Sequence, residues 1–102
     1  MILYEVTLET IPQLEEEVEA YMRLTHIPEI FATGCFQRIR FCHSSSGQLR
    51  TSYEARTRDD LDRYLQDHAP ALRSAFSERF PAGVIAGRNI WHERKVWEQV
   101  LS

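Results

Sequence analysis

The chain has 102 residues, a formal net charge of −3, and a composition of 43% hydrophobic and 26% charged residues. This length predicts one domain with a modest core, and the composition is typical of a globular protein rather than a disordered or membrane-spanning one. Because neither sign of charge forms a long block, the sequence argues against nucleic-acid binding and against a basic membrane-binding patch. The N-terminal residues lack the features of a signal peptide, so we expect a cytoplasmic protein.

The apolar and polar side chains of residues 2–9 alternate, which predicts a first strand with one apolar face. Thr10 and Gln13 fit a capping pattern at the start of a helix, and the apolar stripe that follows predicts a helix ending near Pro28. Further strand patterns and a second helix complete the chain. We expect strands at 35–43, 49–56 and 83–93, a hairpin connection at 44–48, and a helix from about residue 59.

The predicted order is strand, helix, strand, strand, helix, strand. This order indicates an α+β fold of the ferredoxin-like βαββαβ type, in which a four-stranded antiparallel sheet carries two helices on one face. We assign residues 1–92 to this domain and residues 93–102 to a C-terminal tail. The tail is expected to form a short helix that docks Trp97 on a partner.

Both predicted helices run into the same short pattern of histidine, one residue, and proline, at Thr25–Pro28 and at Asp67–Pro70. Proline cannot donate a backbone hydrogen bond within a helix, so we interpret both patterns as helix ends, with a kink or restart at Pro70. His68 lies on the apolar stripe of its helix and is expected to point at the sheet. His26 lies at the edge of its own stripe, about 90° from the centre by helical geometry.

The histidines leave two interpretations open. Each could bond a carbonyl that the helix break exposes, or His68 and His26 could line a ligand pocket in which Tyr4 or Tyr53 supplies a hydroxyl from the sheet. The four histidines show no paired spacing for a metal, so we expect no metal site and no cofactor. Cys35 and Cys42 lie seven residues apart in one predicted strand, where they cannot bridge each other, so we expect two free thiols.

The two faces of the predicted sheet differ in polarity. The face bearing the apolar alternation of the first strand should receive the helices. The opposite face is expected to hold Glu5, Arg38, Arg40, Glu54, Arg56 and Arg88 together with Leu3, Phe36 and Ile90. Such a mixed face can stay solvated or can meet its own symmetry mate, with arginine and glutamate pairing across the contact. We predict a homodimer that closes through Arg38, Arg40, Glu54 and Arg56.

The stretches "HIPEIFATGCF" at 26–36 and "YLQDHAPALR" at 64–73, with "MILYEV" at the start, resemble a family of uncharacterised bacterial proteins within the dimeric α+β barrel superfamily. The resemblance covers about residues 1–92. It implies two sheets paired face to face into a barrel, with a pocket in each protomer between sheet and helices. Because superfamily relatives include cofactor-free monooxygenases, isomerases and haem proteins, the resemblance implies a scaffold rather than a reaction.

Two functional hypotheses follow. The protein binds or converts a small organic molecule in a pocket between sheet and helices, or it is a structural or regulatory homodimer with a packed interior. Cavity volume distinguishes them, because a ligand pocket should exceed roughly 300 Å³ whereas a packed core leaves only isolated voids.

Overall fold

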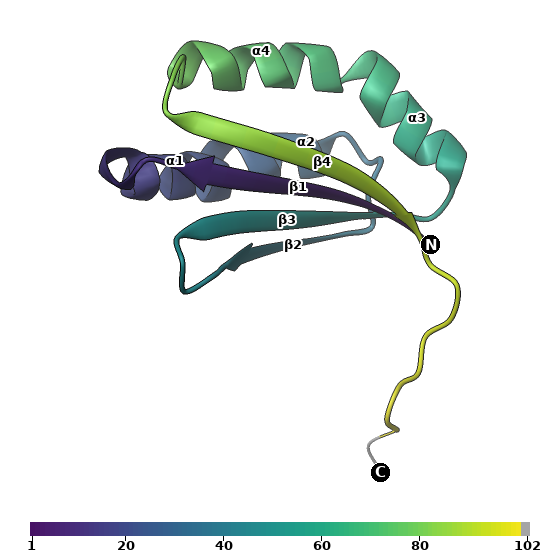
Figure 1. Cartoon of the computed structure of the whole chain (residues 1–102). Helices are drawn as coiled ribbons and strands as arrows, with labels where there is room; N and C mark the ends of the chain where they lie inside the picture. The colour runs from purple at the N-terminus through teal and green to yellow at the C-terminus, as the bar shows by residue number, and fades with distance from the viewer. Residues whose placement is uncertain (101–102) are drawn as a thin grey trace.

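The computed structural model describes residues 1–100 and contains one four-stranded antiparallel sheet (Figure 1). The strands lie in the order β2-β3-β1-β4 across the sheet. Their bounds are β1 (Ile2–Thr10), β2 (Arg38–His43), β3 (Gln48–Ala55) and β4 (Val84–His92). The two central strands, β1 and β3, are the strands that precede the two helical segments. All neighbouring strands run antiparallel. The predicted ferredoxin-like α+β fold is therefore confirmed.

Two helical segments connect the strands. The first comprises a short 3₁₀ turn η1 (Pro12–Leu14), α1 (Glu15–Tyr21), a π-helical turn η2 (Met22–His26) and α2 (Ile27–Ala32). The second comprises α3 (Arg58–Asp67) and α4 (Ala69–Arg79). Both pack against the same face of the sheet, because their buried residues join those of β1 and β3 in the two hydrophobic clusters.

The prediction that the first helix ends near Pro28 is wrong, since the helical segment continues to Ala32. Pro28 has no N–H to offer the carbonyl of Leu24, which would interrupt a regular α-helix. The wider π turn accommodates this gap, with the N–H of Ile27 bonded to the carbonyl of Met22 five residues earlier. The first His-x-Pro pattern therefore lies inside a helix instead of ending one.

The second His-x-Pro pattern does break its helix, as predicted. His68 ends α3 and precedes α4 with φ −121°, and Pro70 then lies in the first turn of α4, where no N–H is needed.

The helix cap predicted at Thr10 is wrong, and the second helical segment has a cap instead. Thr57 caps α3 by accepting a hydrogen bond from the Asp60 N–H at 3.1 Å, whereas the Thr10 hydroxyl is buried without a hydrogen-bond partner in the described residues.

The strand register decides which side chains face the helices. Tyr4, directly opposite Tyr53 and Ile90, belongs to the covered face, and Val6 lies opposite Arg88. The assignment of Arg88 and Ile90 to the opposite face was therefore wrong. Phe36 was also misplaced, because it is buried in the core beside Tyr53 and Tyr64, with ring centroids 5.2 and 4.9 Å away.

After β4 the chain runs away from the sheet, and residues 93–100 form no helix (Figure 1). Within these residues the predicted short helix is absent, and Trp97 is 80% exposed with Lys95 over its ring. The last two residues of the predicted tail lie outside the described part of the chain. Among residues 1–100, no helix is both long and apolar enough to cross a membrane.

Candidate functional site

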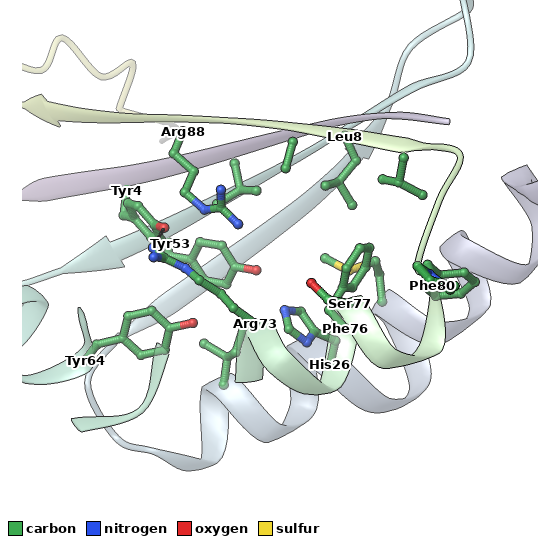
Figure 2. Close-up of a pocket in the computed structure, with 16 residues that line it drawn as sticks. Tyr4, Leu8, His26, Tyr53, Tyr64, Arg73, Phe76, Ser77, Phe80 and Arg88 are labelled. Atoms are coloured by element: carbon green, nitrogen blue, oxygen red, sulfur yellow. Dashed lines mark hydrogen bonds between the residues drawn. The ribbon is translucent and has the colours of Figure 1, made fainter. Parts of the chain in front are cut away.

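A cavity of about 310 Å³ lies between the covered face of the sheet and the helices. Its mouth lies between α4 and β4, because Arg73, Ser77 and Arg88 are its exposed polar members. Figure 2 shows side chains from both layers pointing into this space. The sheet contributes Tyr4, Val6, Leu8, Tyr53, Val84, Ala86 and Arg88, and the helices and the residue after them contribute Met22, His26, Ile30, Tyr64, Arg73, Phe76, Ser77, Phe80 and Pro81.

Two guanidinium groups give the cavity a positive character. Arg88 extends from β4 and Arg73 from α4, so the charges approach from opposite layers (Figure 2). In the described residues neither arginine has a carboxylate partner, and no acidic side chain lines the cavity. Arg73 Nη2 donates to the Tyr4 hydroxyl at 2.9 Å, which ties it to the sheet. Guanidinium groups that line a cavity without a carboxylate partner favour an anionic ligand.

Three tyrosines, Tyr4, Tyr53 and Tyr64, line the cavity close to one another. Tyr4 lies 5.8 Å from Tyr53 and 6.2 Å from Tyr64, measured between ring centroids, and all three are buried. Burial raises the pKa of Tyr64 to about 12, with a further contribution from Tyr4. Burial also raises the pKa of Tyr53 above its usual value. Tyr53 and Tyr64 are therefore neutral near pH 7 and can act as hydrogen-bond donors.

His26 is the histidine of the cavity. Its ring stacks on Tyr21 at 5.9 Å and meets Phe76 edge-on at 5.6 Å. Burial, and then the positive charge of Arg88, lower its pKa from 6.5 to about 4, so the imidazole is neutral near pH 7. Its Nδ1 atom is buried without a hydrogen-bond partner in residues 1–100. His26 therefore offers the ligand an uncharged imidazole held between aromatic rings.

The spacing of the first helical segment explains why His26 faces inward. Val18, Met22, His26 and Ile30 are four residues apart, a spacing that drifts around a regular α-helix by about 40° per step. The π turn at Met22–His26 is wider than an α turn and offsets this drift. The four-residue spacing of these side chains was the one sequence signal, and it identifies His26 only if the helix is locally wider than a regular α-helix.

The structure brings three of the four predicted pocket residues together: Tyr4, Tyr53 and His26 line the cavity, and His68 does not. His68 is only partly buried at the junction of α3 and α4, with its ring 6.5 Å from that of Tyr64. The helix restarts at this junction, so the stripe calculated for one continuous helix does not apply to His68. Sequence reasoning missed Tyr64, Arg73, Phe76, Ser77, Phe80 and Arg88 as cavity residues.

The signal for Arg88 was its place in the alternation of β4. Val84, Ala86 and Ile90 share one face of that strand, and Arg88 is the single charge on it. A lone charge within an apolar alternation indicates a polar group at a buried or cavity position. Ile85 and Trp91 on the other face are also apolar. The sequence pattern of β4 therefore did not decide which of its two faces the helices cover.

The predicted dimer residues lie at the uncovered face of the sheet or next to it. Glu54 is 8% exposed and lies 3.5 Å from Arg38 and 3.9 Å from Arg40, so these charges pair within the chain. Arg56, just beyond β3, donates to Gln37 at 2.8 Å. Register places Ile85, 72% exposed, and Trp91, 50% exposed, on the same uncovered face. This face therefore combines paired charges with exposed apolar side chains.

The two cysteines are free thiols, as predicted, with Cys35 buried and Cys42 exposed. The described residues contain no group of three or more histidine, cysteine, aspartate or glutamate side chains placed to hold a metal ion. The polar groups of the cavity are thus hydroxyls, guanidiniums and one imidazole.

Comparison with known proteins identifies one family. The family model described as Domain of unknown function (DUF4286) matches residues 1–93. A search of curated proteins found no significant match.

Solved structures share the fold at low sequence identity. A Deinococcus radiodurans protein proposed to be an antibiotic biosynthesis monooxygenase superposes with a TM-score of 0.71 and 10% identity, covering 98% of this chain and 99% of that one. Rv0793 from Mycobacterium tuberculosis gives 0.67 and 15%, covering 96% and 100%. A dimeric ferredoxin-like protein from an uncultured marine organism gives 0.70 and 6%, covering 97% and 100%. At these identities the likeness concerns the fold alone.

Proposed function

This chain belongs to the family described as Domain of unknown function (DUF4286), and we propose that it binds a small organic acid in the cavity between its sheet and helices. The observation that carries the proposal is the pair of arginines, Arg73 and Arg88, at a cavity that no acidic side chain of residues 1–100 lines. An anion there can accept hydrogen bonds from both guanidinium groups, and a charge-assisted hydrogen bond is among the stronger polar contacts.

The apolar residues that line the cavity determine the size and shape of the apolar part of the ligand. Leu8, Met22, Ile30, Phe76 and Phe80 surround the space below the arginines. A volume of about 310 Å³ lies at the lower end of the range for ligand pockets, roughly 300 to 1,000 Å³. The ligand is therefore a compact acid with an aromatic or branched apolar body. This volume favours a ligand-binding protein over a dimer with a packed interior.

The test uses 2-naphthoate as the probe acid and isothermal titration calorimetry as the measurement. We expect wild-type protein to bind 2-naphthoate, and Arg88→Gln to lower the affinity by roughly 10- to 100-fold, because a hydrogen bond to a charged group contributes about 1.5 to 3 kcal/mol. Arg50→Gln is the matched control, since Arg50 is exposed on the opposite face of the sheet. Equal binding to wild type and Arg88→Gln would contradict the proposal.

We also propose that two copies pair through the uncovered face of the sheet. The support is the exposed apolar pair Ile85 and Trp91 beside Leu3, which lies opposite Trp91 in the sheet. The marine ferredoxin-like protein is described as dimeric, which is a property of that protein. Arg38, Arg40, Glu54 and Arg56 would then border the contact.

Light scattering at micromolar concentration tests the pairing. We expect about twice the chain mass of 12.0 kDa. Trp91→Arg should reduce the mass to that of the monomer, because it places a charge in an apolar contact. His92→Arg adds the same charge one residue away, on the other face of β4, and should leave the dimer intact.

A further inference from the structure

We propose that the bound acid carries a hydroxyl group on its apolar body and that His26 recognises this hydroxyl. The inference rests on the proposed function, because it assumes that an organic acid occupies the cavity. It adds a second point of recognition, deeper than the arginines at the mouth, and so defines the ligand class as a hydroxy-substituted aromatic acid.

The His26 side chain has no polar partner within residues 1–100. Its side chain makes no hydrogen bond within residues 1–100, and Nδ1 is buried. Nε2 is therefore the nitrogen that a molecule in the cavity can reach. Figure 2 shows the imidazole in the same space as the hydroxyls of Tyr53 and Ser77. A polar ring kept among aromatic side chains costs stability unless a partner is supplied.

The neutral charge state of His26 favours a hydroxyl partner over a carboxylate. The imidazole is neutral near pH 7, so one of its nitrogens carries a proton and the other accepts. A hydroxyl group can donate or accept, and it therefore fits Nε2 in either tautomer. A second carboxylate could be met only by one N–H of a neutral ring and would lose its hydration, so it fits this position less well.

The side chains around His26 favour a flat, rigid ligand. Tyr21 stacks on the imidazole and Phe76 meets it edge-on, which fixes the plane of the ring. Arg88 and His26 line the same cavity of about 310 Å³. The acid group and the hydroxyl group are therefore bound within one small space. A flat ligand of one or two fused rings suits a cavity of this volume and can pack against Phe76.

Matched probe acids test this inference in the wild-type protein. Affinities are measured by calorimetry for 2-naphthoate and for its 1-, 3- and 6-hydroxy derivatives, because these acids differ only by the hydroxyl and its position. At least one hydroxy acid should bind about 10-fold more tightly than 2-naphthoate, the gain expected for one well-placed hydrogen bond. His26→Phe should abolish this preference, so that 2-naphthoate and its hydroxy derivatives bind the variant with similar affinities. His68→Ala, the control at a histidine that does not line the cavity, should keep the preference.

The outcomes separate the two proposals. If no acid binds the wild type, the proposed function itself fails. If 2-naphthoate binds and no hydroxy acid binds more tightly, the function stands and the role of His26 is refuted. A preference that survives in His26→Phe refutes it as well. Because a variant can fold poorly, the ¹⁵N chemical shift of His26 Nε2 in wild type provides an independent measurement. This shift should move farther with the preferred hydroxy acid than with 2-naphthoate, and equal movements would refute the role of His26.

Discussion

Acid should destabilise this protein through His26. In the folded chain the pKa of His26 is about 4, whereas an unfolded histidine has its ordinary value of 6.5. Between these values the unfolded chain binds a proton that the folded chain excludes. The stabilising contribution is therefore fully present above pH 6.5 and is lost progressively as the pH falls towards 4.

The magnitude follows from the two pKa values. With a folded value of about 4 and an unfolded value of 6.5, the contribution lost between pH 7.5 and pH 5 is at most about 2 kcal/mol. Partial exposure of the ring to solvent reduces this, so we expect a loss of about 1 to 2 kcal/mol. That is a substantial part of the stability of a small domain.

Urea denaturation followed by circular dichroism, at pH 7.5, 6.5, 5.5 and 5.0, measures the effect as a difference between variants. Other titrating groups contribute equally to wild type and to His26→Phe, so the difference between their free energies of unfolding isolates His26. The variant should gain about 1 to 2 kcal/mol relative to wild type as the pH falls. His92→Phe, at the exposed end of β4, is the control and should follow the wild-type profile. Parallel profiles for wild type and His26→Phe would refute the reasoning.

Three further predictions concern other parts of the fold. Gly83→Ala should destabilise the protein by about 1 to 3 kcal/mol in urea, because Gly83 has φ +89° and an added Cβ would lie 2.8 Å from Leu14; an unchanged midpoint would contradict this. Thiol labelling of native protein should modify exposed Cys42 quickly and buried Cys35 only on unfolding, and equal rates would argue against the observed burial. His68→Ala should leave the affinity for 2-naphthoate unchanged, because His68 does not line the cavity, and a tenfold loss would show that it acts there.

The order of strands and helices could be read from the sequence because it depends on local pattern. The two-residue alternation of β1 and the stripe of the first helix are properties of neighbouring residues. The restart at Pro70 was also predictable, since the missing N–H is a local fact. Tyr4 and Tyr53 were placed on the cavity side because alternation in the central strands has a clear apolar face.

The rest depended on contacts between distant segments. Apolar residues occur on both faces of β4, and only its register with β1 places Arg88 beside Val6 inside the cavity. A π turn has no strong local signature, and its hydrogen-bonding pattern turns His26 towards the sheet where regular helical geometry would leave it at the edge. The sequence by itself determined the fold and two tyrosines of the site, Tyr4 and Tyr53. Tertiary structure decided which histidine and which arginines meet them, because strand register and a non-standard helical turn set the directions of those side chains.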